Sequence, residues 1–241
     1  MDRFAMKTLI IAQRELSSFF YSPIAYVVMA LFMVLAGMLF RPGFASGEPA
    51  EMRILFGATV WVLIGLAPAI TMRLFAEEQR SGTIETLMTS PVTDAQVVIG
   101  KWLGALGFYA LLLSPTLVCV VLLEIWGRPD YGPIVTGYIG LLLLGGLYLA
   151  IGTCASVLTR NQIIAFVITL VIILVLTVVT HFLQFLLPPS WGKAMLFLNV
   201  NHQYEAFAKG LIDFACVTYF VSGILLFLVI AAVGLHSRRW R

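Results

Sequence analysis

Charged residues are scarce in this chain. Only 11% of its 241 residues are Asp, Glu, Lys or Arg, whereas 61% are hydrophobic, and the mean hydropathy is +0.99. A soluble domain carries roughly a quarter charged residues. Because the deficit coincides with long apolar runs, the composition predicts an all-α polytopic membrane protein, with residues 1–241 forming one transmembrane domain. The net charge of +3 gives no reason to expect nucleic acid as a partner.

Several chemical motifs are missing as well. The chain contains no GxxxxGK[ST] phosphate loop and no HExxH motif, so we expect neither ATP hydrolysis nor metal-dependent proteolysis, and no cofactor or metal site. Carboxylates and histidines are nearly absent from the middle of the apolar runs, which argues against ion-coupled transport. Cys119, Cys154 and Cys216 lack CxxC spacing and are expected to be small buried residues.

Six apolar segments have about the length that a membrane-spanning helix needs. An even number of spans places both termini on one side of the membrane. The side with the termini holds ten Lys or Arg residues and the other side five, so the positive-inside rule predicts cytoplasmic termini. The expected spans are about 24–40, 54–72, 101–123, 134–158, 163–187 and 215–235.

The N-terminal segment 3–21 is predicted to be an interfacial helix. Leu9, Ala12, Leu16 and Phe19 fall on one helical face, opposite the charged residues, and Ile11 is the misfit. Ser22-Pro23 predicts a turn before the first span. A cleavable signal peptide is the alternative for this end, although the basic amphipathic lead is long for one.

The polar hairpin 73–101 separates the second and third spans. Gly82 is expected to end a helix that extends the second span, and Ser90-Pro91 to end a short helix over 83–89. Thr93 and Gln96 have the spacing of a capping box, so the third helix is expected to begin at Asp94, before the membrane. These signals predict a short helix on two stiff legs, and an ordinary structured loop is the alternative.

Two further features leave alternatives open. Glycines in the third and fourth spans predict close helix approach, either within one subunit or between two. Segment 188–214 is too polar to span and is predicted to form an interfacial amphipathic loop with short helices, whereas the family resemblance described below implies a gate or re-entrant element there. His181 is expected to be a satisfied interfacial histidine rather than part of a translocation path.

The hairpin sequence resembles the ABC-2 type transporter permease family. The resemblance lies in the core E-E-x-x-S-G-T-x-E-x-L-x-x-S-P-V, which begins at Glu77. The stretches RELSSFFYSPIAYVV at 14–28 and GLIDFACVTYF at 210–220 resemble the gliding-motility-associated subgroup of that family. The resemblance covers essentially the whole chain, but its motifs do not identify the transported substrate.

The resemblance implies a permease in the bacterial inner membrane, with six spans and a coupling helix that docks on a separate ATPase. It implies two ATP-binding subunits that hold ATP and Mg, a second identical or different permease subunit, surrounding lipid, and room for an extracytoplasmic accessory subunit. It also implies an outer gate in segment 188–214, for which the candidates are Asn199, Asn201, His202 and Tyr204. The candidate coupling residues are Glu77, Glu78, Arg80, Gly82, Thr83, Ile84, Glu85, Leu87, Met88, Ser90 and Pro91.

Export is therefore the expected activity, with the ATPase in a partner subunit. The alternatives are a membrane scaffold or force-transmitting subunit that moves no substrate, and an ATP-independent transporter. The hairpin argues against the ATP-independent transporter, because a secondary transporter does not need a site for docking an ATPase.

Overall fold

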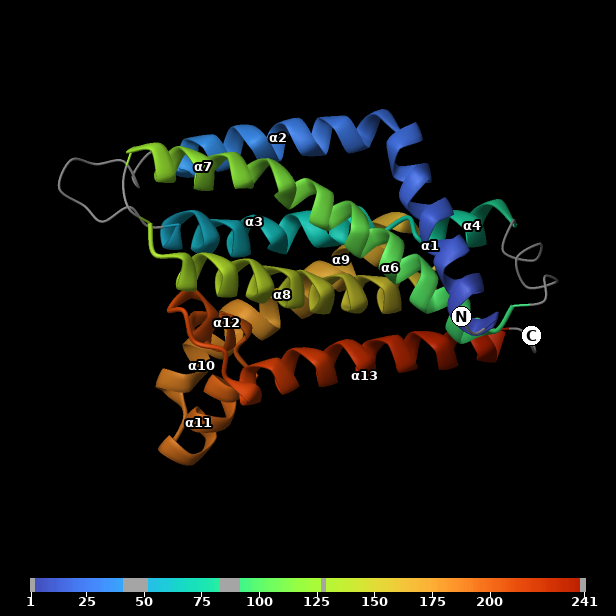
Figure 1. The fold of residues 1–241 in the computed structure, drawn as a ribbon. Coiled ribbons are helices and arrows are strands. Elements are labelled where there is room, and N and C mark those ends of the chain that lie inside the picture. Colours follow the sequence, from blue (N-terminus) through green and yellow to red (C-terminus); the bar gives the residue numbers. More distant parts are fainter. Residues whose placement is uncertain (1–2, 41–51, 83–91, 127–128, 239–241) are drawn as a thin grey trace.

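All regular secondary structure in the described part of the chain is helical. The computed structural model describes residues 3–40, 52–82, 92–126 and 129–238 (Figure 1). Among these residues, five helices are long and apolar enough to cross a membrane, and a bent pair of helices makes a sixth. The prediction of an all-α polytopic membrane protein is therefore confirmed. The five are Arg53–Arg80, Asp94–Ile125, Tyr131–Leu158, Gln162–Leu186 and Phe214–Ser237.

The bent pair consists of α1 (Arg3–Tyr21) and α2 (Pro23–Phe40), which meet at 79° across Ser22. Helix α1 packs across α6 (Asp94–Leu113), and two glycines of α6 make this contact possible. A Cβ on Gly104 would lie 2.7 Å from the Glu15 Cβ, and one on Gly100 would lie 2.8 Å from the Ile11 Cβ. Ile11, the misfit of the predicted apolar face of α1, therefore lies against α6, whereas Leu9 on that face is 57% exposed.

The second span, α3 (Arg53–Thr71), accommodates Pro68 within its last turn. After a tight turn the chain forms α4 (Ala76–Ser81), which ends at Gly82 with a φ of 75°, as Gly82 had predicted. The third span begins at Asp94 as predicted, but it is not continuous. At Ser114-Pro115 it passes through a 3₁₀ turn, η2 (Ser114–Thr116), into α7 (Leu117–Trp126), because proline cannot donate the α-helical hydrogen bond.

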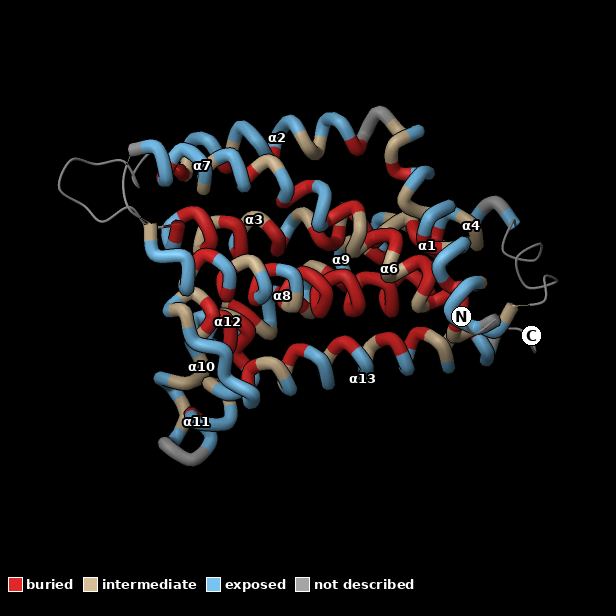
Figure 2. Tube along the Cα trace, viewed as in Figure 1, coloured by how far each residue is buried: buried red, intermediate tan, exposed pale blue. Residues whose placement is uncertain are grey.

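Helix α8 (Tyr131–Leu158) lies at the centre of the bundle. It contacts α3, α6, α12 and α13, and it is mostly buried, whereas α2 and α7 are exposed along much of their length (Figure 2). Its glycines admit neighbouring side chains: a Cβ on Gly145 would lie 2.2 Å from the Tyr109 ring, and one on Gly152 1.9 Å from the Thr71 hydroxyl. These glycines therefore serve packing within one subunit, the first of the two alternatives.

The fifth span is interrupted by a π-helical turn. Helix α9 (Gln162–Leu174) continues through η3 (Val175–Val179) into α10 (Thr180–Leu186). Segment 188–214 then forms α11 (Pro189–Leu198) and α12 (Val200–Ala208), and α13 (Phe214–Arg238) returns along the bundle. Helices α10, α11 and α12 lie at the end of the bundle opposite both termini (Figure 1).

Candidate functional site

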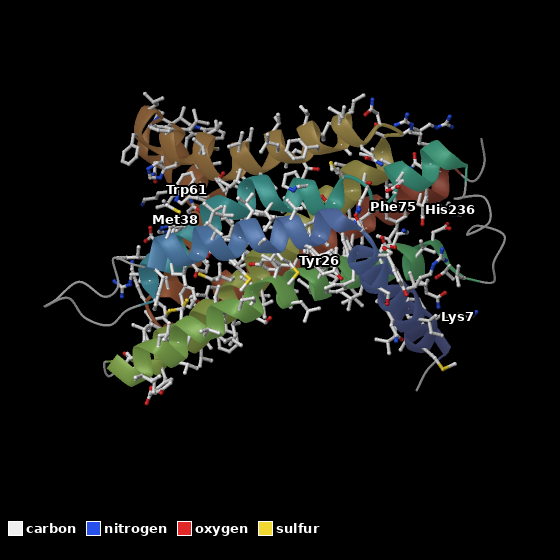
Figure 3. The ribbon with its side chains drawn as sticks, turned by 90° about the horizontal axis from the view of Figure 1, so that it is seen from above. Lys7, Tyr26, Met38, Trp61, Phe75 and His236 are labelled. Atoms are coloured by element: carbon white, nitrogen blue, oxygen red, sulfur yellow. The ribbon has the colours of Figure 1, made fainter. Side chains whose placement is uncertain are left out.

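Chemically distinctive residues gather at the two ends of the bundle. Viewed from above, Lys7, Phe75 and His236 lie toward one end, which also holds both termini, and Met38 and Trp61 lie toward the other (Figure 3). We call these the termini end and the far end. The predicted coupling residues that the structure describes belong to the termini end, and the predicted gate residues belong to the far end.

A buried lysine joins three helices at the termini end. The Lys101 Nζ lies 2.9 Å from Glu15 Oε2 on α1 and 2.9 Å from Glu78 Oε1 on α4, and Lys101 is only 2% exposed. The same Nζ lies 5.2 Å from the centroid of the Phe75 ring. A buried ammonium is tolerated only where opposite charges compensate its lost hydration. Lys101 therefore fixes α1 and α4 relative to α6.

Helix α4 is also attached to the end of α8. The Ser156 Oγ accepts hydrogen bonds from the backbone N–H groups of Phe75 and Ala76, at 3.0 and 3.1 Å. The Gln79 side chain donates to the Val157 carbonyl at 2.9 Å. The first N–H groups of a helix have no partner within the helix, so Ser156 satisfies donors that would otherwise be orphaned. This leg of the hairpin is consequently held by side chains far away in the sequence.

The other leg begins with the predicted capping box. The Thr93 hydroxyl accepts from the Gln96 N–H, and the Gln96 side chain accepts from the Thr93 N–H at 2.9 Å. In the first turn of this helix, the Asp94 carboxylate lies 2.9 Å from the His236 ring on α13. The start of α6 is therefore fixed both locally and by the last helix.

The predicted coupling residues divide into three groups. Glu77 and Arg80 are exposed on α4, whereas Glu78 faces inward and pairs with Lys101. Gly82 ends α4. The remaining candidates lie outside the described residues: Thr83, Ile84, Glu85, Leu87, Met88, Ser90 and Pro91.

Sequence reasoning missed the Lys101 cluster. Lys101 was seen only as the end of a polar stretch, and Glu15 was placed on the solvent face of α1. The signal in the sequence was a lone lysine between Gly100 and Gly104. Glycines at this spacing allow another helix to pack closely, so the lysine could have been expected to lie at a helix crossing. Recognising its partner required knowing that α1 crosses at that point.

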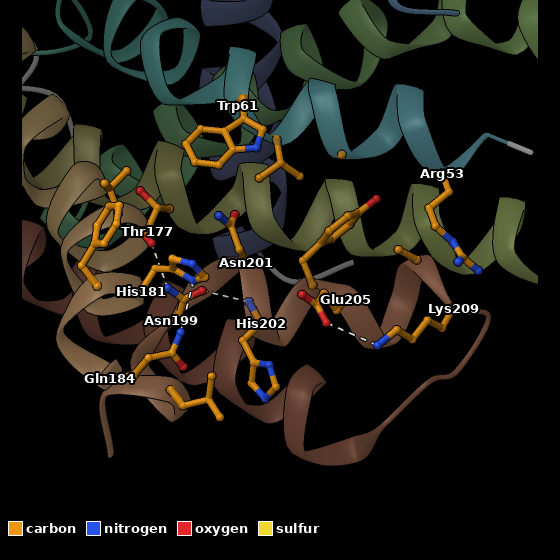
Figure 4. A pocket seen from close by; sticks show the side chains of 17 residues that line it. Arg53, Trp61, Thr177, His181, Gln184, Asn199, Asn201, His202, Glu205 and Lys209 are labelled. Atoms are coloured by element: carbon orange, nitrogen blue, oxygen red, sulfur yellow. Dashed lines mark hydrogen bonds and ion pairs between the residues drawn. The ribbon is translucent and has the colours of Figure 1, made fainter. Parts of the chain in front are cut away.

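At the far end, a cavity of about 650 Å³ opens between α3, the broken fifth span and the α11–α12 pair (Figure 4). All four predicted gate residues line it. The sequence alone did not indicate that they would face α3 and the fifth span across a cavity. Sequence reasoning did not predict the contribution of Arg53, Trp61 and His181. The lining residues that matter most are Arg53, Trp61, His181, Asn199, Asn201, His202, Tyr204 and Lys209.

Asn199 connects this cavity to the π-helical turn. Its side-chain oxygen accepts from the His202 N–H and so begins α12. Its amide nitrogen donates to the Thr177 carbonyl and to the Thr180 hydroxyl, both at 2.8 Å. A π-helical turn alters the hydrogen-bonding register of a helix, and the Asn199 amide stabilises this one from outside. One side chain thus joins the start of α12 to the break in the fifth span.

Tyr204 lies on α12 with 4% of its surface exposed. Burial raises the pKa of its phenol, so the hydroxyl stays protonated and can donate a hydrogen bond. Its ring packs against α8, where a Cβ on Gly140 would lie 3.0 Å from it. Tyr204 therefore lines the cavity with a neutral side chain whose position is fixed by its packing against α8.

Together these features define a polytopic helical membrane protein with a braced polar hairpin at one end and a pocket at the other. Residues 9–238 match the model of the family described as ABC-2 family transporter protein, and the chain belongs to this family. It is accordingly a transmembrane ABC-2 permease, in a family that implies partnership with an ABC ATP-binding subunit. A search of curated protein sequences found no match.

Proposed function

We propose that this permease is the membrane half of an ABC exporter, driven by a separate ATPase that docks on hairpin 73–101. In this arrangement the termini end is cytoplasmic, as the excess of positive charge on that side favours. The membrane is the bacterial inner membrane. ATP and Mg are held by two ATP-binding subunits rather than by this chain.

The observation that best supports this proposal is the bracing of both hairpin legs. Helix α4 is bound to α8 through Ser156, and α6 is bound to α1 and α4 through Lys101. A rigid attachment transmits displacement, whereas a loose loop would absorb it. A push on the hairpin by a closing ATPase pair would therefore move the helices that continue into the second and third spans.

Substrate passes between two permease subunits, which are identical or different. The exposed apolar surfaces of α2 and α7 are available to surrounding lipid or to the second permease. Asn199, Asn201, His202 and Tyr204 lie where a substrate would leave, at the end opposite the ATPase, where an accessory subunit could also bind.

The test is to purify the permease with its cognate ATP-binding subunit and to compare variants of the hairpin. Leu87→Ala and Glu85→Gln are expected to weaken capture of the ATPase at least tenfold and to uncouple ATP hydrolysis from transport in proteoliposomes. Arg160→Gln is the matched control, because Arg160 lies at the same end in the short turn between α8 and α9.

The outcomes separate the alternatives. Full binding and full coupled transport in both hairpin variants would show that the hairpin is not the docking site. A wild-type complex that hydrolyses ATP but moves none of a panel of labelled lipids and amphiphiles would favour the force-transmitting scaffold. Unchanged thermal stability of the variants ensures that uncoupling is not a folding defect.

A further inference from the structure

Two buried polar groups in the far-end cavity have unmet hydrogen-bonding capacity. Within the part of the chain that the structure describes, neither the Tyr204 hydroxyl nor the Asn201 Oδ1 has a hydrogen-bond partner. Figure 4 shows Asn201 between Trp61 and His202, facing the centre of the cavity. A buried polar group without a partner is destabilising, because it has lost its hydration and gained no hydrogen bond in return. A ligand that accepts a hydrogen bond from the Tyr204 hydroxyl and donates one to the Asn201 amide oxygen would satisfy both groups.

The charge of the lining favours an anion. Arg53 and Lys209 contribute two positive charges, and Glu205 contributes one negative charge, so the formal sum is +1 with neutral histidines. Lys209 and Glu205 form an exposed pair at 3.3 Å. Arg53 and Lys209 also line a neighbouring hollow of about 170 Å³, together with Asp130. Arginine is well suited to phosphate, because its planar group can donate two parallel hydrogen bonds.

The cavity also continues onto an apolar surface. Phe182 lines it and is 62% exposed, and the same helix carries Phe185 and Leu186, which are 74% and 79% exposed. Trp61 forms part of the wall on the opposite side (Figure 4). An occupant with a polar head in the cavity would therefore have a route for an acyl chain along α10, into the surrounding lipid.

We propose that the far-end cavity binds the head group of an anionic phospholipid that carries both a phosphate and a free hydroxyl, as phosphatidylglycerol does. The phosphate accepts from the Tyr204 hydroxyl and pairs with Arg53, and the head-group hydroxyl donates to Asn201 Oδ1. The acyl chain follows Phe182 out of the cavity. The proposal depends on the exporter function only for naming this end extracytoplasmic, since binding is measured on the resting permease.

Trp61 provides the readout. Brominated lipids quench tryptophan fluorescence on contact, and the Trp61 signal is obtained as the difference between the wild-type protein and Trp61→Phe. Purified permease in detergent is titrated with brominated phosphatidylglycerol, brominated phosphatidylcholine or inorganic phosphate. Phosphatidylglycerol is expected to half-quench Trp61 at a concentration about tenfold below that of phosphatidylcholine, which has the phosphate but lacks the head-group hydroxyl and carries a compensating ammonium. This ratio corresponds to about 1.4 kcal/mol.

Two variants test the assigned contacts. Arg53→Gln removes the cation, and Asn201→Leu replaces the acceptor amide with an apolar side chain of similar size. Each is expected to raise the half-quenching concentration of phosphatidylglycerol about tenfold. Lys193→Gln is the matched control, since Lys193 is an exposed cation on α11 that does not line the cavity. Unchanged melting temperatures confirm that the variants are folded.

Three results would overturn the proposal. The first is equal quenching by the two lipids, and the second is unchanged affinity in both variants. The third is inorganic phosphate that perturbs Trp61 in a protein that phosphatidylglycerol does not quench, which would assign the site to a soluble phosphate. None of these results requires transport, so the lipid site and the exporter function can fail separately.

Discussion

Lys101 Nζ and Glu15 Oε2 are separated by 86 residues of sequence and by 2.9 Å in space. This contact brings the N-terminal helix against the hairpin leg that precedes the third span. Glu78 completes the cluster from the other leg. If the hairpin couples to an ATPase as proposed, the attachment of α1 is part of the mechanical path from the hairpin.

Removing the lysine should weaken this attachment. Lys101→Met leaves the Glu15 and Glu78 carboxylates facing each other without a cation, and because both are partly exposed we expect a loss of about 2–3 kcal/mol, below the ~3–5 kcal/mol of fully buried pairs. Thermal unfolding of the detergent-purified protein measures it. Adding Glu15→Gln and Glu78→Gln should recover most of the loss. If the triple variant were no more stable than Lys101→Met, charge compensation would not be the reason.

Ser156→Ala tests the anchorage of α4. The substitution removes the acceptor used by the backbone N–H groups of Phe75 and Ala76. Two buried donors lose their partner, so we expect a destabilisation of about 1–3 kcal/mol together with a lower ratio of transport to ATP hydrolysis. Ser222→Ala, at an exposed position on α13, should change neither. A stable Ser156→Ala protein with normal coupling would show that α4 needs no attachment to α8.

The close crossing of α1 and α6 predicts a steep dependence on side-chain size. Gly104→Ala places a Cβ 2.7 Å from the Glu15 Cβ and 2.9 Å from the Ala12 carbonyl, so α1 must shift, at a cost of about 1–3 kcal/mol. Gly65→Ala is the control, because nothing lies within 4 Å of its Cβ. Melting temperatures of the two variants compare them directly. Equal stabilities would mean that α1 does not rest on α6 as described.

Asn199→Asp separates the two roles of Asn199. The carboxylate keeps the acceptor for the His202 N–H, but it loses the amide that donates to the Thr177 carbonyl and the Thr180 hydroxyl. We expect a loss of about 2 kcal/mol, since an unpaired buried carboxylate oxygen would face a carbonyl. Asn161→Asp, at the exposed cap of α9, should leave the free energy of unfolding unchanged. If Asn199→Asp also left it unchanged, the link to the π-helical turn would contribute nothing to stability.

The local part of this structure could be predicted from the sequence, and the long-range part could not. Thr93 and Gln96 predicted the start of α6 because a capping box involves only neighbouring residues. The π-helical turn has no comparable signal, since the amide that stabilises it comes from Asn199, about twenty residues away. Pro115 was visible in the sequence, yet its effect on the third span was overlooked because the apolar pattern runs through it.

The same division holds for the two ends of the bundle. The family resemblance implied an outer gate in segment 188–214, and the four polar or aromatic candidates chosen there do line one cavity. Arg53 and Trp61 were not connected with them, because a span more than a hundred residues earlier gives no sign of what it will face. For the hairpin, the sequence identified Glu78 as a coupling residue, whereas the structure shows its carboxylate paired with Lys101.

Helix α8 contacts both ends. Ser156, near its C-terminus, holds the start of α4, and Thr136, near its N-terminus, donates a hydrogen bond of 2.7 Å to the Phe207 carbonyl of α12. A 28-residue helix is a rod about 42 Å long. Tilting such a rod by about 5° about one end displaces the other by roughly 4 Å. Thr136 and Ser156 are about 30 Å apart along this rod, so the same tilt imposed at the hairpin would move the α12 contact by roughly 3 Å, without any helix having to unfold.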